Sequence, residues 1–274
     1  MEYPPFSVLM SLYINEKGMY FNECMQSILR QTVLPAEIII VYDGPVSKEI
    51  KVMVDEYKRT NPGLIKTIEN EYNKGLGLAL ADGVVACSYE LIARMDTDDI
   101  ARQDRFEKQL KEFMADPALD ICGSHILEFE GSISNIVAQR KVPLNHDEIV
   151  QYQKKRDGFN HVTVMFKKTS VLNAGNYQSC LLMEDTLLWA NMFMNGAKGK
   201  NIDDNLVYVR IGRDMYERRG GLSYFRKYTI GRKRIYETSF ISKYDYYLTL
   251  MIQFIVAVMP NKIRGMVFKK LLHR

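Results

Sequence analysis

Three carboxylates crowd into four positions near the middle of the chain, directly after a short apolar run. The segment covers residues 91–100, and the carboxylates are Asp96, Asp98 and Asp99. Carboxylates this close repel one another, which is unfavourable unless a cation is present. Mg²⁺ and Mn²⁺ prefer oxygen ligands, usually one or two carboxylates together with the phosphates of a nucleotide. The segment by itself predicts either a metal site or a solvated acidic turn that caps a helix.

Strand-like and helix-like patterns alternate through the first hundred residues. The expected strands cover residues 6–13, 37–42, 64–68 and 91–95, with amphipathic helices between them. This alternation predicts an α/β fold with a parallel sheet and right-handed crossovers. The carboxyl ends of such strands meet at one edge, where ligands bind. Tyr13, Asp43, Lys74 and the acidic segment should therefore converge, and this convergence favours the metal site.

Strands and helices continue through the middle of the chain. We expect helices at 104–114, 145–155 and 170–174, with another beginning at 183, and strands at 121–129, 133–142, 162–166 and 206–210. The pair at 121–129 and 133–142 should be antiparallel around Glu130 and Gly131. Asn145 and Glu148 have the spacing of a capping box for the short helix.

The composition is that of an ordinary globular protein, with 274 residues of which 47% are hydrophobic and 26% are charged. The four cysteines are isolated, which predicts buried reduced thiols, no structural zinc and a cytosolic location. The first residues lack the basic and apolar regions of a signal peptide.

The charge is distributed unevenly. Residues 211–274 contain 14 Lys and Arg against 4 Asp and Glu, whereas residues 1–210 contain 23 and 29. We therefore expect a catalytic body at 1–210 and a basic helical extension at 211–274. An anionic partner would suit this extension, either a membrane surface or nucleic acid.

An uncharged apolar run, residues 246–259, lies between basic segments of the extension. Its fourteen residues are too few to cross a bilayer as a helix, which takes about 20. Two interpretations remain open: an interfacial helix in the headgroup layer of anionic lipid, or a core helix of the C-terminal part.

An ordered set of motifs resembles glycosyltransferase family 2 over roughly residues 6–210. The motifs are SVLMS at 7–11, EIIIVYDG at 37–44, NKG at 73–75, DTDD at 96–99 and ED at 184–185. The chain is most similar to the members that build O-antigen, capsule and amylovoran-type exopolysaccharide, through NHVTVMF at 160–166 and YERRGG at 216–221. It departs from the family at Tyr42, where many members have a second aspartate before Asp43.

The resemblance implies a GT-A fold, with a mostly parallel sheet flanked by helices. It implies inverting, metal-dependent transfer of a hexose from a UDP-sugar, with UDP-galactose the first choice. The implied acceptor is a saccharide on undecaprenyl diphosphate at the inner leaflet of the bacterial cytoplasmic membrane. Mn²⁺ or Mg²⁺ is the implied cofactor.

The same resemblance assigns roles on the nucleotide side. Asp43 can accept a hydrogen bond from the uracil imide, and Tyr13 can stack on the ring. Asp98 is the direct metal ligand, and Asp96 binds the ribose hydroxyls or the ion. Lys74 adds a cation near the phosphates, and the remaining members of the nucleotide-sugar site are Ser11 and Gly75.

Asp185 is the candidate general base that deprotonates the acceptor hydroxyl, with Glu184 beside it. Alternatively, both carboxylates merely satisfy a helix N-terminus. His161, Trp189 and Arg210 are the other candidates for the acceptor side. Their alternatives are a structural histidine, a core tryptophan and, for Arg210 together with the arginines at 218 and 219, a solvated basic face.

Other functional classes fit less well. Gly75 and Gly77 lack the third glycine of a dinucleotide fingerprint, so a dehydrogenase is disfavoured. A nucleic-acid binder would use the extension but leave the acidic segment without a purpose, so no nucleic-acid partner is expected. A non-catalytic sugar-nucleotide-binding partner of a polysaccharide assembly complex is the main alternative, and it should tolerate loss of Asp185.

Overall fold

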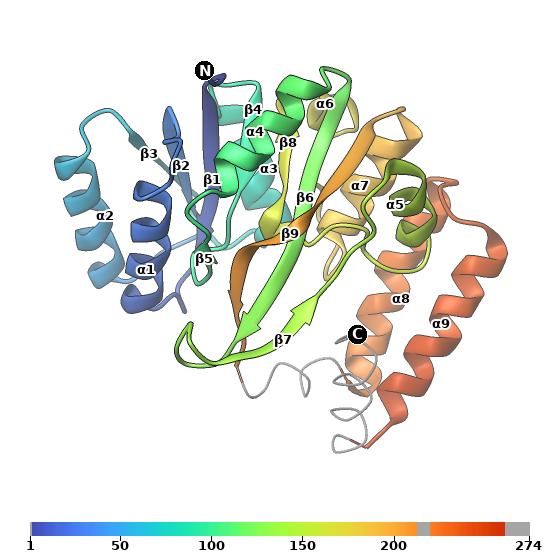
Figure 1. The fold of residues 1–274 in the computed structure, drawn as a ribbon. Helices are drawn as coiled ribbons and strands as arrows, with labels where there is room; N and C mark the ends of the chain where they lie inside the picture. The colour runs from blue at the N-terminus through green and yellow to red at the C-terminus, as the bar shows by residue number, and fades with distance from the viewer. Residues whose placement is uncertain (1, 213–219, 261–274) are drawn as a thin grey trace.

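A computed structural model describes residues 2–212 and 220–260. Their strands form one curled sheet in the order β3-β2-β1-β4-β8-β6-β9-β5, with β7 paired to β6 (Figure 1). The strands are β1 (Phe6–Leu12), β2 (Glu37–Tyr42), β3 (Ile65–Glu69), β4 (Leu91–Arg94), β5 (Ile100–Ala101), β6 (Leu119–Phe129), β7 (Ile136–Arg140), β8 (Met165–Lys167) and β9 (Lys198–Arg210).

The predicted α/β class is confirmed, with helices on both faces of the sheet. They are α1 (Gly18–Leu29), α2 (Lys48–Thr60), α3 (Leu76–Ala86), α4 (Arg105–Ala115), α5 (His146–Gln153), α6 (Lys168–Asn173), α7 (Glu184–Met194), α8 (Gly221–Glu237) and α9 (Lys243–Val258), with a short 3₁₀ helix, η1 (His161–Thr163). Pairing is parallel from β3 to β4, as expected. Farther along it is mixed, because β8 runs antiparallel to both β4 and β6.

The core forms two layers because side chains alternate across the sheet. In β1, Val8 and Met10 pack with α1, α2 and α4, whereas Leu9 packs on the opposite face with α3 and α7. All three side chains are fully buried. Burial of each such side chain contributes about 1.5–3 kcal/mol, so this strand anchors both layers. The four cysteines are also buried and unpaired, as expected.

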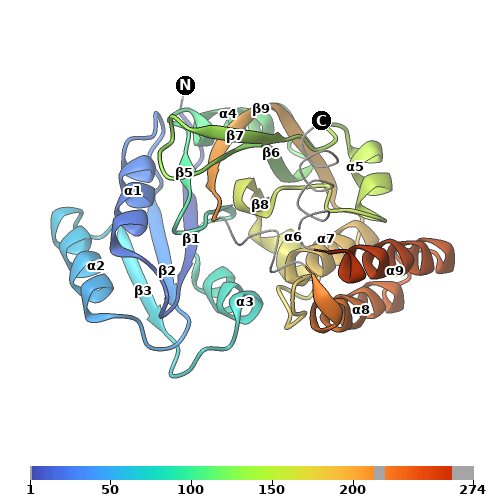
Figure 2. The same cartoon turned by 90° about the horizontal axis from the view of Figure 1, so that it is seen from below.

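The helices α8 and α9 pack side by side at the end of the molecule opposite α2 (Figures 1 and 2). A separate apolar cluster joins α8 to α7 and includes Met183, Leu187 and Ile235. The described part of the extension after β9 is therefore largely helical, as predicted.

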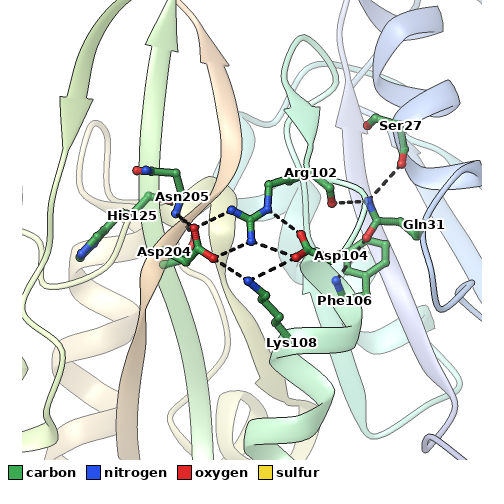
Figure 3. A network of polar contacts seen from close by, with 10 residues as sticks. Ser27, Gln31, Arg102, Asp104, Phe106, Lys108, His125, Asp204 and Asn205 are labelled. Atoms are coloured by element: carbon green, nitrogen blue, oxygen red, sulfur yellow. Dashed lines mark hydrogen bonds and ion pairs between the residues drawn. The ribbon is translucent and has the colours of Figure 1, made fainter.

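A network of charged side chains fastens the short strand β5 and helix α4 to β9 (Figure 3). Arg102 binds Asp204 with two hydrogen bonds of 2.5 and 2.6 Å, and it also binds Asp104 at 2.5 Å. Lys108 reaches the same Asp204 at 2.6 Å. Because β5 directly follows the acidic segment, this network fixes the exit of that segment on the sheet.

Three local predictions need correction. Residues 162–166 do not form one strand, because Thr163 bonds back to the Asn160 carbonyl and closes a 3₁₀ turn before β8. The capping box at Asn145 does not form, since its side chain makes no cap hydrogen bond to α5. The expected last strand at 206–210 is instead the end of the longer β9, which begins at Lys198.

We predict that Gly123→Ala destabilises the protein by about 1–3 kcal/mol, the cost of overpacking a core. A Cβ atom there would lie 2.3 Å from Asn201 Oδ1 and 2.9 Å from Phe159. Asn201 is held by hydrogen bonds to two backbone carbonyls and cannot yield. Urea unfolding measures the effect. Gly212→Ala is the matched control, because nothing lies within 4 Å of its Cβ position, and equal losses in the two variants would contradict the prediction.

Candidate active site

The three carboxylates gather in the turn that follows β4. One oxygen from each of Asp96, Asp98 and Asp99 lies within 4.8 Å of the others. Residues 97–99 form a turn rather than an extended strand, so the adjacent Asp98 and Asp99 need not point to opposite faces. The backbone N–H of Arg210 donates to Asp99 at 2.8 Å. The structure thus brings Asp99 close to Asp96 and Asp98, the two carboxylates expected to bind the ion.

The cluster is electrostatically strained. Burial raises the pKa of Asp98 to about 6, and the charges of Asp96 and Glu16 add to the effect. Burial, Asp98 and Asp96 raise the pKa of Asp99 well above its usual range. Partly buried carboxylates that repel one another and offer only oxygen ligands fit Mg²⁺ or Mn²⁺. We assign this cluster as a candidate divalent-metal site.

Arg94 is the functional candidate that our sequence analysis missed. Its side chain is 2% exposed and forks onto Asp96 with hydrogen bonds of 2.8 and 2.5 Å. The Arg94 carbonyl in turn accepts a hydrogen bond from the fully buried Arg105. The available signal was an arginine within an apolar strand two residues before a carboxylate, because such a buried cation needs a partner.

Asp43 lies at the end of β2 and binds the loop that precedes α3. Its two oxygens accept from the backbone N–H groups of Lys74 at 2.6 Å and Gly75 at 3.0 Å. Gly75 has a φ of 87°, a left-handed conformation that favours glycine. The Lys74 ammonium instead pairs with Asp82 on α3. Each Asp43 oxygen retains the capacity for a second hydrogen bond.

The end of β1 places the other two predicted nucleotide-side residues near this loop. Ser11 pairs with Val41 in the sheet, one position before the pairing of Leu12 with Tyr42. Tyr13 follows directly and is 45% exposed.

Asp185 lies in the first turn of α7 and is largely buried. Burial, with the charges of Asp157 and Glu184, raises its pKa to about 7. Burial also raises the pKa of Glu184. One Asp185 oxygen accepts from the Thr186 N–H at 2.8 Å, and the other lies 3.9 Å from His161 Nδ1. The helix-terminus role therefore uses one oxygen, while the second faces His161.

His161 is an uncharged neighbour of this carboxylate. Burial and the nearby Arg94 charge hold its pKa well below the usual range. Its Nε2 atom lies 2.8 Å from the Tyr177 hydroxyl. With one ring nitrogen at Tyr177 and the other toward Asp185, the imidazole is fixed in orientation.

Gly77 allows α3 to approach α7 closely. A Cβ atom at this glycine would lie 2.8 Å from the Gln178 carbonyl oxygen and 2.9 Å from Glu184 Cβ. The absence of a side chain thus brings the loop bound by Asp43 against the helix that begins with Glu184 and Asp185.

Two predicted acceptor residues have other roles. Trp189 is fully buried and packs edge-to-face on His161, so it belongs to the core and does not face an acceptor. Arg210 donates to the Asp98 carbonyl, pairs with Glu23 and is only 7% exposed. It therefore braces the acidic turn and is no acceptor clamp. The arginines at 218 and 219 lie outside the described residues.

A cavity of about 1170 Å³ connects part of the acidic turn with Asp185, whereas Asp43 and Asp98 are not among the residues that line it. Arg94, Asp96, Asp99, His161 and Asp185 all line it. The acidic turn, which suits a cation, and Asp185, whose pKa is raised, thus face one cavity. The two segments are nearly ninety residues apart in the sequence.

The family profile described as "Glycosyl transferase family 2" matches residues 7–173. The chain belongs to this glycosyltransferase family. Two relatives each share 35% identity with it: the UDP-Gal:alpha-D-GlcNAc-diphosphoundecaprenol beta-1,3-galactosyltransferase of Escherichia coli and the amylovoran biosynthesis glycosyltransferase AmsE of Erwinia amylovora. The alignments cover 99% and 97% of this chain, respectively, and 98% of each relative.

Solved structures share the fold of this glycosyltransferase. S. aureus TarS 1-349 in complex with UDP gives a TM-score of 0.61 at 15% identity, over 98% of this chain and 70% of TarS. GalNAc-T7 with UDP, GalNAc and Mn²⁺ gives a TM-score of 0.63 at 16% identity, over 76% of this chain and 44% of GalNAc-T7. The expected family and its GT-A fold are confirmed.

We predict that Asp98→Asn raises the melting temperature of the metal-free glycosyltransferase by a few degrees at pH 7.5, because it removes one repelling charge. The pKa of Asp98 is raised from 3.8 to about 6, so the wild-type protein regains this stability as the pH falls through 6 towards 4. The gain of the variant should disappear over the same range.

Differential scanning calorimetry, which measures these melting temperatures, also tests the metal site. Mn²⁺ should raise the melting temperature of the wild-type protein but not of Asp98→Asn. Asp55→Asn, at an exposed position on α2, is the charge-matched control and should respond like the wild-type protein. A wild-type melting temperature that Mn²⁺ leaves unchanged would refute the site.

Proposed function

We propose that this glycosyltransferase transfers a hexose, with UDP-galactose the first choice, from a UDP-sugar to a saccharide on undecaprenyl diphosphate, with inversion. The transfer belongs to cell-surface polysaccharide biosynthesis. The observation that supports it most is the single cavity lined by both the acidic turn and Asp185. The galactosyltransferase relative, similar over nearly the whole chain, supports the donor and acceptor classes.

On the donor side, Asp98 and Asp99 would hold Mn²⁺ or Mg²⁺ directly, with Asp96 beside them. A bound ion supplies Lewis-acid stabilisation of the charge that develops on the leaving diphosphate. Asp43 would accept the uracil imide hydrogen while its loop bonds persist, and Tyr13 would stack on the base. Ser11, Lys74 and Gly75 complete this side, Gly75 through its backbone.

On the acceptor side, Asp185 takes the proton of the attacking hydroxyl. The new C–O bond forms as the anomeric carbon loses the diphosphate, which keeps the electron pair of the broken bond. A base with a pKa of about 7 is well matched to this task near neutral pH. His161 is uncharged and lies 3.9 Å from the carboxylate, and Glu184 occupies the same helix turn but is not among the residues that line the cavity.

We predict that Asp185→Asn lowers kcat by at least about 100-fold, the usual contribution of a general base, and leaves UDP affinity unchanged. The assay uses Mn²⁺, a synthetic GlcNAc-diphospho-lipid and UDP-galactose, UDP-glucose or their N-acetyl forms. Wild-type kcat/KM should rise with pH through about 7, because Asp185 must lose its proton to act.

Asp147→Asn, in the first turn of α5, is the matched control and should retain full activity. Wild-type protein that binds UDP-sugars but transfers none of them would contradict the transferase proposal and indicate a non-catalytic binding partner. Equal activity of Asp185→Asn and the wild-type protein would refute the base.

We also propose that the enzyme is peripheral on the cytoplasmic face of the bacterial inner membrane and contacts its inner leaflet through α9. Only Asp245, Thr249 and Ala257 of this helix are buried, which favours the interfacial helix over the core helix. Its outer face exposes large apolar side chains at Tyr244, Tyr247, Met251, Phe254, Ile255 and Val258. None of the helices in the described segments is long and apolar enough to cross a membrane.

We predict that Met251→Ser combined with Ile255→Ser lowers partitioning onto anionic phospholipid vesicles about tenfold, because two apolar anchors are lost. Vesicle sedimentation measures the effect. Val52→Ser, which removes an equally exposed apolar side chain from α2, is the control. If the wild-type protein has no affinity for these vesicles, the membrane proposal is wrong.

A further inference from the structure

The cavity continues past Asp185 into a space between α8 and α9 that has two unlike walls. The α8 wall is polar and basic, with Ser223, Tyr224, Lys227, Tyr228 and Arg232. Tyr224, Tyr228 and Arg232 are spaced four residues apart and so share one helix face, and Ser223 and Lys227 lie beside that face. The α9 wall is largely apolar, with Leu248, Ile252, Val256 and Met259.

Arg232 is the cation set deepest in this end. Its side chain is 2% exposed, and its Nε atom donates to Thr249 Oγ1 at 2.9 Å. A second donor reaches the Lys154 carbonyl. Within residues 2–212 and 220–260, no carboxylate forms an ion pair with this guanidinium. Burial lowers the pKa of Arg232, and the charges of Asp157 and Asp245 oppose this only at longer range, so an anionic ligand in direct contact would stabilise the buried guanidinium.

Two further cations rim the same space. Lys227 lies five residues before Arg232 on α8 and forms no ion pair with the described residues. Arg156 packs over the Tyr152 ring, with its guanidinium 6.0 Å from the ring centroid. Arginine and lysine positioned together in this way are the usual ligands of phosphate oxygens.

A chain of contacts places this basic end beyond the candidate base. Asp185 adjoins Thr186, whose hydroxyl donates to Asp157 at 2.5 Å, and Asp157 directly follows Arg156. The acidic turn lies on the other side of Asp185, through Arg94 and His161. A sugar with its hydroxyl at Asp185 therefore has room to direct its other end towards α8 and α9.

We propose that this end of the cavity binds an organic diphosphate that carries an apolar chain, with the phosphates at Arg232, Lys227 and Arg156 and the chain along the α9 wall. This is the headgroup of the acceptor, so the inference rests on the proposed function and specifies where its lipid diphosphate binds. The site is distinct from the acidic turn, where the donor diphosphate requires a metal.

Calorimetric titration with farnesyl diphosphate in EDTA tests the proposal, because chelation silences the metal-dependent donor site. We expect Lys227→Gln to raise the Kd about tenfold, as expected for loss of one charge-assisted contact. Lys233→Gln is the matched control on the same helix, since Lys233 is 67% exposed and pairs with Glu237 outside the cavity. It should bind like the wild-type protein.

Two further measurements separate the contribution of the basic α8 wall from that of the apolar α9 wall. Farnesol, which lacks the diphosphate, should bind more weakly than farnesyl diphosphate to the wild-type protein. Ile252→Ser should weaken binding of farnesyl diphosphate but not of inorganic diphosphate, because only the former has a chain to place along α9.

Equal affinities of Lys227→Gln and Lys233→Gln, or no binding of farnesyl diphosphate by the wild-type protein, would overturn the proposal. Turnover with the synthetic acceptor is measured separately. A protein that transfers sugar but fails the titration loses only this subsite, whereas one that passes the titration and transfers no sugar loses only the proposed function.

Discussion

The carboxylates after β4 repel one another, and much of the neighbouring structure holds them together against this repulsion. Asp96, Asp98 and Asp99 remain together because other groups oppose their separation. Arg94 neutralises Asp96 through a two-pronged contact, and the Arg210 backbone holds Asp99. The network around Arg102 then anchors the strand that follows. A preorganised acidic site therefore depends on arginines from two distant strands.

The two arginines illustrate how similar residues differ in role. Arg94 lines the cavity and offers its charge to that space. Arg210 donates to the backbone of the acidic turn and lies against the rings of Tyr20 and Phe129. Its guanidinium forms an ion pair with Glu23. Chemical type alone does not separate these roles, because they are decided by what each side chain meets.

Local sequence signals predicted much of the fold and fewer of the site contacts. The β2 strand, expected at residues 37–42, followed from its run of β-branched residues and is present. The two-residue strand β5 was not predicted, because it forms only through long-range pairing with β9. The proximity of Asp99 to its neighbours depended on a turn whose geometry no periodicity records. Arg94 could have been found from its apolar setting, whereas the bracing role of Arg210 required the tertiary structure.

The missing side chain of Gly77 has a mechanical consequence. Helix α3 and the start of α7 meet there through rigid atoms, with no flexible side chain to absorb movement. The loop that begins α3 is bound by Asp43, and α7 carries Asp185. A shift of that loop would therefore be passed on to the first turn of α7, so that, under the proposed function, occupation of the donor side would alter the position of Asp185.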